Sequence, residues 1–383
     1  MTNPIIRRPA GISRTIFVIS LVVVGAVTGS VGYYAGGGFR PGPTVTTING
    51  AGATFPYPLL SAMGVNYSRT HLTVAINYNS QGSSFGRTNF IAKTIDFGAS
   101  DAPLSDSERG QAPGSLHIPE TIGSVVLAYN LKEVPNSGLQ LDGATIAMIY
   151  SKNMTWNDPA IQNLNPNLAS ILPARPIRPV HRSDGSGTTF IFTNWMAKSS
   201  GGIWSTSNTG SSVTWPNITT GLGGKGNEGV AGSVLGNPDT IGYVELNYAI
   251  VNKMKSSYVK NTAGTFVQPT QANSSVAVDS AIASQNLPTG DQSWTSVTLL
   301  NAPGANSYPI VGFSYLLVYK ELNVVPGMDQ TKAKALVDFL WWVVHDGQAL
   351  SSALSYVRLP QSAVTIDENT IKSITFNGQI LHP

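Results

Sequence analysis

Cysteine is absent from this sequence, and charged residues are scarce, at 11% of 383 positions. The absence of cysteine excludes disulfide bonds, thiolate metal ligands, a thiol nucleophile and a lipid-modified cysteine anchor. The five histidines are scattered without the spacing of metal ligands, so the sequence predicts neither a metal site nor another cofactor. Glycine, serine, threonine and asparagine supply most of the polarity, which is typical of secreted and cell-surface proteins.

The small excess of positive charge belongs to the N-terminus. The formal net charge is +3, but Arg7, Arg8, Arg14 and Arg40 precede every acidic residue. Without these four, the chain has 19 basic and 20 acidic residues and is almost neutral. Such a surface argues against nucleic acid as a partner.

An N-terminal membrane anchor is predicted. Residues 16–35 carry no charge, and twenty helical residues are long enough to cross a bilayer. The preceding arginines predict a cytoplasmic N-terminus and an external main domain, and residues 36–43 are typical of a linker. We therefore expect residues 1–45 to hold the protein at the cell surface as an uncleaved transmembrane helix. The alternative is a signal segment whose removal yields a secreted protein, although residues 26–28 make a poor cleavage site.

Short apolar runs alternate with helical patterns after residue 45, which predicts an α/β protein. Residues 45–48 and 74–78 are expected to be strands, and Leu59, Leu60 and Met63 mark one face of a helix between them. Small hydroxyl or acidic residues follow three strand or turn ends, at residues 50–56 (GAGATFP), 82–84 (GSS) and 96–101 (DFGASD). The last of these, residues 96–101, is expected to be a turn. Open α/β sheets bind ligands at such ends.

Two apolar runs, residues 125–129 and 315–319, are the most strand-like of the chain. We interpret them as crossovers between two lobes that act as a hinge. The first lobe would comprise residues 46–125 and 315–383, and the second residues 126–314. Near the C-terminus, an apolar helix face around Leu336 and Leu340 is expected to end at Gly347 as the C-cap.

Residues 181–190 (HRSDGSGTTF) have the composition of a cradle for a small oxyanion. The apolar residues that follow Gly187 predict a helix starting there, so free backbone N–H groups would face a ligand. Arg182 adds a planar fork that suits an oxyanion. The alternative at this point is a serine-capped helix start with a surface Arg–Asp pair.

Catalytic interpretations find little support. Residues 221–229 resemble a phosphate-binding loop, but Gly226 follows Lys225 where Ser or Thr is required, so we interpret them as a loop that shapes the wall of a cleft. Ser186 does not lie in a G-x-S-x-G motif. We therefore expect no catalytic residues and no enzyme activity.

Six motifs in order carry a specific resemblance, from about residue 46 to the C-terminus: GAGATFP (50–56), GSS (82–84), DFGASDAPLSD (96–106), RSDGSGT (182–188), GLGGKGN (221–227) and IGYVE (241–245). In this, the chain resembles the PstS-type phosphate-binding proteins of phosphate ABC importers, within the periplasmic-binding-protein superfamily. The resemblance implies a two-lobed, type II-like fold with phosphate in the cleft between the lobes. It also implies delivery of phosphate to the importer's permease by a monomeric protein. A cell-surface phosphatase or phosphoesterase, or a phosphate sensor without transport, remains the alternative.

The resemblance also implies a set of phosphate-binding residues: Thr54 (hydroxyl), Phe55 (backbone N–H), Ser83, Asp101, Arg182, Asp184, Ser186, Gly187 and Thr188. Asp184 would also hold Arg182 in place. Asp101 would accept the proton of hydrogen phosphate, because a buried carboxylate facing an anion is costly unless a proton lies between them. Fully ionised sulfate, which has no such proton, would be rejected. Phe85 departs from the family pattern, in which a small residue is usual at this position.

Overall fold

The computed structural model describes residues 44–216 and 219–382. The transmembrane segment and linker predicted within residues 1–43 lie outside the described residues. In the part that is described, no helix is both long and apolar enough to cross a membrane.

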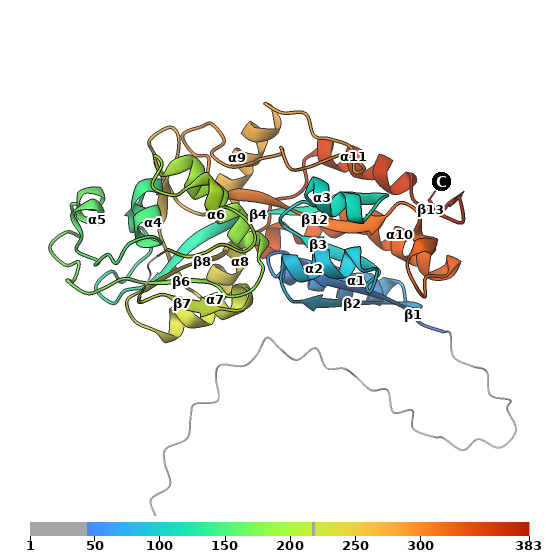
Figure 1. The fold of residues 1–383 in the computed structure, drawn as a ribbon, viewed down its shortest axis with the longest axis horizontal. Coiled ribbons are helices and arrows are strands. Elements are labelled where there is room, and N and C mark those ends of the chain that lie inside the picture. Colours follow the sequence, from blue (N-terminus) through green and yellow to red (C-terminus); the bar gives the residue numbers. More distant parts are fainter. Residues whose placement is uncertain (1–43, 217–218, 383) are drawn as a thin grey trace, which may run out of the picture. The chain divides into compact units, whose positions relative to one another are not determined.

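A nine-stranded sheet forms the centre of the fold, in the order β2-β1-β3-β12-β4-β8-β6-β7, with β9 beside β4 (Figure 1). Its first strands are β1 (Thr46–Gly52), β2 (Val74–Ser80), β3 (Phe97–Ser100), β4 (Ser115–Asn130) and β12 (Val311–Tyr319). The remaining ones are β6 (Arg178–Arg182), β7 (Leu222–Gly224), β8 (Thr240–Glu245) and β9 (Lys255–Ser256). Strands β1, β2 and β3 run parallel to one another, as do β6, β7 and β8.

Strand β4 belongs to both ends of this sheet. Residues 115–124 pair with β12, and residues 125–130 pair with β8. We call β2, β1, β3, β12 and residues 115–124 of β4 the first half, and residues 125–130 of β4 with β8, β6 and β7 the second half. All sixteen residues of β4 except Asn130 are buried, which explains the apolar run at residues 125–129.

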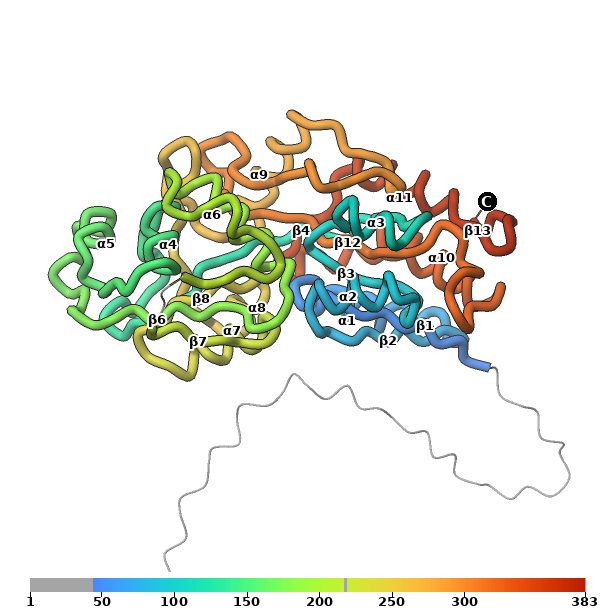
Figure 2. Tube along the Cα trace, viewed as in Figure 1, coloured from blue at the N-terminus to red at the C-terminus, as the bar shows by residue number. Residues whose placement is uncertain are grey.

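Helices cover both halves of the sheet (Figure 2). Those against the first half include α1 (Tyr57–Thr70), α2 (Ser83–Ile91), α10 (Gln330–Val344) and α11 (Gln361–Lys372). Those against the second half include α6 (Gly187–Ser199), α7 (Gly226–Gly236) and α8 (Leu246–Val251). Shorter or more peripheral helices are α3 (Asp106–Gln111), α4 (Gly143–Ile149), α5 (Pro159–Leu164) and α9 (Gln271–Ile282). Small sheets are formed by β5 (Gln140–Leu141), β10 (Tyr258–Lys260) and β11 (Phe266–Val267), and by β13 (Thr375–Phe376) and β14 (Gln379–Ile380).

Several local predictions are confirmed. Leu59, Leu60 and Met63 are buried on one face of α1, because their spacing places them together against the sheet. The two strands predicted around this helix are β1 and β2, and the helix predicted at Gly187 is α6.

Two local predictions were wrong. Residues 97–100 were expected in a turn but form β3, because all four are buried and pair with β1 and β12. Gly347 does not cap α10, which ends at Val344 with His345 as its C-cap. Gly347 instead lies in a short 3-10 segment, packed so tightly on Trp342 that a Cβ atom would stand 3.0 Å from its ring.

The run predicted as a second crossover, residues 315–319, lies inside the first half. Tyr315 pairs with Ser100 of β3 on one side and with Pro119 of β4 on the other. The chain therefore enters the first half before β12 begins at Val311.

Candidate anion-binding site

The loops that follow parallel strands of the two halves contact one another. The loop after β1 contains Thr54, which bonds to Asn227 after β7. The segment after β2 contains Ser83, which bonds to Gly187 after β6. Such carboxyl ends are where open α/β sheets bind ligands, and helices α2, α6 and α7 also begin there.

Arg182, the last residue of β6, is buried and firmly held. Its Nε and Nη2 donate to the two carboxylate oxygens of Asp184, at 2.7 and 2.5 Å, and its Nη1 donates to Thr188 Oγ1 at 3.3 Å. Within the described residues these bonds use three of the five guanidinium N–H groups, which leaves two for a ligand. Burial opposes ionisation of Asp184, but the bonds from Arg182 and from the Gly226 N–H keep the pKa of Asp184 below its usual value. Asp184 thus holds the Arg182 guanidinium in a fixed, buried orientation, and the two do not form a surface ion pair.

Asn227 connects the two threonines of the cluster. The backbone N–H and the Nδ2 of Asn227 both donate to Thr54 Oγ1, at 3.2 and 2.8 Å. Thr188 Oγ1 accepts from the same Nδ2 at 3.1 Å and from Arg182 Nη1. Asn227 Oδ1 accepts from the Glu245 N–H at 2.9 Å, which fixes the orientation of the amide. Each threonine oxygen already accepts two hydrogen bonds, so each hydroxyl can only donate its proton.

The Ser83 hydroxyl also accepts two hydrogen bonds from the protein. Its Oγ accepts from the backbone N–H of Gly187 at 3.0 Å and of Asp101 at 3.2 Å. Its proton points toward Asp101 Oδ2, at 3.3 Å. Two buried threonine hydroxyls and a guanidinium therefore present free donors in one place, beside a serine that donates to Asp101, which is the chemistry of an anion site.

Gly187 allows the two halves to approach closely at this point. A Cβ atom at this position would lie 2.5 Å from Ser83 Oγ and against the carboxylate of Asp101. Only glycine fits where α6 begins, so the N–H groups of its first turn can reach across to the first half.

Asp101 is a buried carboxyl of the cluster and, unlike Asp184, is not paired with Arg182 by a hydrogen bond. Burial raises the pKa of Asp101 to about 7, although hydrogen bonds from Ser314 and Ser83 and the charges of Arg182 and Arg87 act in the opposite direction. Ser314 Oγ lies 2.9 Å from Asp101 Oδ1. This carboxyl can therefore change between acceptor and donor near neutral pH.

Two predicted residues have additional structural contacts. Ser186 is the N-cap of α6 and accepts from the Thr189 N–H at 3.1 Å. Phe55 is buried, and its carbonyl accepts from the Tyr356 hydroxyl at 2.6 Å. Their contacts with a ligand stay a prediction.

The sequence analysis missed Asn227, Ser314 and Arg87. Asn227 stood in a quoted motif but was interpreted only as part of a cleft wall. Its place directly after a short apolar strand, at a helix start, was the signal that pointed to the site. Ser314 and Arg87 had no comparable signal, because they lie within regular elements.

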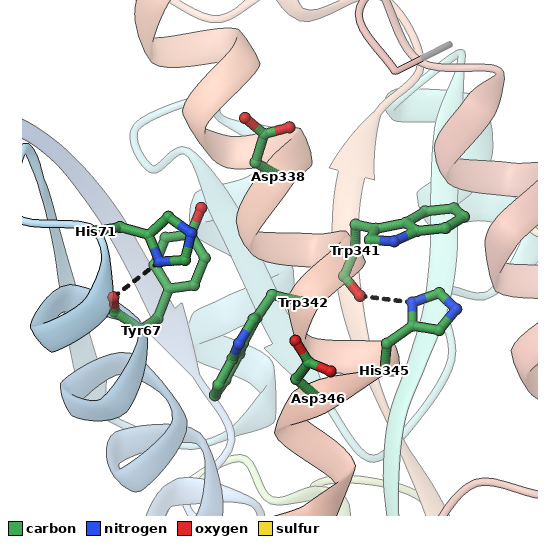
Figure 3. Close-up of a pocket in the computed structure, with 7 residues that line it drawn as sticks. All are labelled: Tyr67, His71, Asp338, Trp341, Trp342, His345 and Asp346. Atoms are coloured by element: carbon green, nitrogen blue, oxygen red, sulfur yellow. Dashed lines mark hydrogen bonds between the residues drawn. The ribbon is translucent and has the colours of Figure 1, made fainter.

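A separate hollow of about 400 Å³ lies between α1 and α10 (Figure 3). Its lining residues are Tyr67, His71, Asp338, Trp341, Trp342, His345 and Asp346, none of which is a predicted site residue. Two aromatic residues on α10 and the carboxylates beside them make its lining partly apolar and partly charged.

Within residues 44–216 and 219–382, no group of three or more His, Asp or Glu side chains is arranged to hold a metal ion.

The fold and this site define a solute-binding protein, and comparisons with known families agree. A family model described as the PBP superfamily domain matches residues 39–346. The phosphate-binding protein PstS of Methanocaldococcus jannaschii is 36% identical over 371 residues, which cover 93% of this chain and 95% of the relative. PstS of Xylella fastidiosa is 41% identical over 318 residues, covering 83% and 82%. The chain belongs to the PstS family of phosphate-binding proteins.

Solved structures support the fold. A high-affinity periplasmic phosphate-binding protein, PfluDING, solved with phosphate, superposes with a TM-score of 0.65 at 20% identity, covering 86% of this chain and 98% of that one. A phosphate-binding protein from Stenotrophomonas maltophilia gives 0.64 at 18% identity, covering 85% and 94%. The predicted α/β periplasmic-binding-protein fold is thereby confirmed.

Proposed function

We propose that this protein is an extracellular substrate-binding protein that captures hydrogen phosphate and delivers it to an ABC-type phosphate importer. The observation that carries the proposal is a buried cluster in which Thr54, Thr188 and Arg182 have donors left to offer, together with the carboxyl of Asp101, to which Ser83 and Ser314 donate. This set matches an anion that carries one proton. Relatives over most of the chain are named phosphate-binding proteins, so we propose binding without catalysis.

The complete proposed site consists of Thr54, Phe55, Ser83, Asp101, Arg182, Asp184, Ser186, Gly187 and Thr188, with Asn227 added as a positioning residue. Donors from both halves would contact one phosphate. Asp101 would accept the ligand's proton, and sulfate would meet an unshielded carboxylate.

We further propose that the two halves act as lobes, divided as 46–125 with 315–383 and 126–314, and that phosphate binds in the cleft between them. All of β12, from Val311 to Tyr319, pairs with residues 115–124 of β4. We therefore propose that the last segment of the first lobe begins at Val311 and not at residue 315. The hinge would then lie at Ser124 and Val125 of β4 and in the chain just before Val311. A ligand that bridges both lobes favours their closed arrangement.

The membrane and the permease are the proposed partners of a monomeric protein. Residues 16–35 would anchor it to the outer face of the cytoplasmic membrane, and a secreted form without this segment is the alternative. The mass of the mature protein distinguishes the two.

Calorimetry tests the function directly. The purified protein should bind phosphate and give almost no signal with sulfate at equal concentration. Arg182→Ala should weaken phosphate binding by at least ~1.5–3 kcal/mol, the value of hydrogen bonds to a charged group. Comparable affinities for both anions would refute the role of Asp101, and an unchanged Arg182→Ala variant would refute the site. Turnover of a phosphate ester would instead identify a phosphatase.

A further inference from the structure

A second buried carboxyl group lies behind the site. Glu120 belongs to β4 and is as deeply buried as Asp101. Ser314 Oγ lies between the two, 2.9 Å from Asp101 Oδ1 and 3.1 Å from Glu120 Oε1. The three side chains therefore form a chain of hydrogen bonds that leads away from the ligand position.

A β-bulge puts Glu120 in this position. Ser314 stands opposite Thr121 and Tyr315 opposite Pro119, so Glu120 has no partner across the ladder. Bulges of this kind redirect a side chain, and here the carboxyl faces Ser314. The Glu120 carbonyl accepts from Gln348 Nε2 at 2.9 Å, which secures the bulge.

The number of protons limits the protonation states that Asp101, Ser314 and Glu120 can adopt together. A serine hydroxyl has a single proton, so Ser314 cannot donate to two carboxylates. If both carboxyls were ionised, one of its two short contacts would join oxygen atoms without a proton between them. One of the carboxyls must therefore carry a proton and donate it to Ser314, which then donates to the other.

The order in which these three side chains donate hydrogen bonds decides whether Asp101 faces a ligand as an ionised or as a neutral carboxyl. With the proton on Glu120, Ser314 donates to Asp101, and Asp101 is an acceptor that suits hydrogen phosphate. With the proton on Asp101, the order reverses: Asp101 donates to Ser314, and its other oxygen belongs to a neutral carboxyl, which is a weaker acceptor for hydrogen phosphate and no longer repels sulfate by its charge. The two states thus differ in selectivity.

The surroundings favour the charge on Asp101. Arg182, Arg87 and the Ser83 hydroxyl stabilise an ionised Asp101, whereas among the described residues an ionised Glu120 is stabilised by the hydrogen bond from Ser314 alone. Burial raises the pKa of Glu120 to about 8, and the charge of Asp101 adds to this rise. The titratable and charged groups that face either carboxyl are Tyr78 (β2), Arg87 (α2), Arg182 (β6), Glu245 (β8), Tyr315 (β12) and Tyr356.

We propose that Glu120 is a positioning residue for phosphate selectivity: it holds a proton, donates it to Ser314, and thereby keeps Asp101 an acceptor. The inference rests on the proposed function, since it needs Asp101 to face the ligand's proton. Glu120 itself does not touch the ligand.

The pH profile of two matched variants tests it. Above pH 8 the free protein should lose the Glu120 proton, so phosphate binding would require uptake of a proton. Wild-type affinity should then fall by about tenfold per pH unit. In Glu120→Gln the amide donates to Ser314 without titrating, so affinity should equal wild type at pH 7 and stay level up to pH 10. In Glu120→Leu, Ser314 keeps Asp101 as its carboxyl partner, so phosphate affinity should likewise stay level up to pH 10.

Ser314→Ala and infrared spectroscopy add independent readouts. Loss of the Ser314 donor should raise the pKa of Asp101, so the ratio of phosphate to sulfate affinity at pH 7 should drop at least tenfold. Burial also raises the pKa of Glu245 and of Asp367, so the infrared absorption of protonated carboxyls at pH 7 should lose one component, and not disappear, in Glu120→Gln. The inference fails if Glu120→Gln loses affinity above pH 8 as steeply as wild type, or if no component is lost. Failure of wild type to bind phosphate would instead overturn the proposed function.

Discussion

A hydroxyl group is both donor and acceptor, and this site removes the second property from three of them. Thr54, Thr188 and Ser83 receive two hydrogen bonds each from groups of the protein. The protons of the two threonines then remain free to donate to an anion, whereas the proton of Ser83 is directed at Asp101 Oδ2. Asn227 supplies three of these six bonds, so we expect it to matter for binding as a positioning residue.

Asn227→Ala should weaken phosphate binding by about 1–3 kcal/mol, or roughly 5- to 150-fold, because two threonine hydroxyls regain freedom to turn. Calorimetry at neutral pH would measure this loss. Asn237→Ala is the matched control at the other end of α7, where the side chain bonds only to the Ser233 carbonyl within the described residues. Equal affinities for the two variants would contradict the positioning role.

The sequence could predict residues whose partners are near in the chain. Arg182, Asp184 and Thr188 lie within seven positions, and their mutual bonds follow from that spacing. Asn227 bonds to Thr54 across 173 positions, and Ser314 to Asp101 across 213. Such pairs depend on the order of the strands in the sheet, which cannot be predicted from a local sequence pattern.

At the scale of elements, the start of α6 is the part that reaches between the halves. Its Ser186 cap holds the first turn, and Gly187 brings that turn against Ser83 and Asp101. The sequence predicted this helix well, since its apolar residues and its glycine spacing are local. It could not predict β3, whose four residues become a strand only between β1 and β12.

Gly187→Ala should lower phosphate affinity at least tenfold, because a methyl group would collide with Ser83 and Asp101 and hold the halves apart. Gly232→Ala on α7 is the control, since a Cβ atom there would have no neighbour within 4 Å. That substitution should leave binding unchanged and stabilise the fold by about 0.4–1 kcal/mol. Phosphate titration and urea unfolding of both variants would decide, and normal binding by Gly187→Ala would contradict the close approach.

For the whole molecule, individual hydrogen bonds also join the halves around the site, among them the Tyr248 hydroxyl to the Thr54 carbonyl at 2.7 Å and Arg87 Nη1 to Ser211 Oγ at 3.2 Å. Lys225 Nζ donates to Gln81 Oε1 at 2.7 Å in an exposed position, and the Ser84 N–H donates to the Gly185 carbonyl at 3.1 Å. Bonds of this kind contribute about 0.5–1.5 kcal/mol each. A bridging ligand could therefore shift the balance between open and closed arrangements.

Phosphate should accordingly reduce the radius of gyration measured by small-angle X-ray scattering, while sulfate at the same concentration should not. Arg182→Ala should remain expanded at phosphate concentrations that compact the wild type. Identical scattering curves with and without saturating phosphate would rule out closure of the proposed lobes.

The continuity of β4 has a consequence for how a loaded protein is recognised. Residues 115–124 pair with β12 and residues 125–130 with β8, so a twist at the proposed hinge would leave the strand pairs of each half in place. Rotation then changes the spacing of surface features on the two halves while each half stays intact. A permease that grips both halves could distinguish full from empty protein by this spacing alone, without ever sensing the anion.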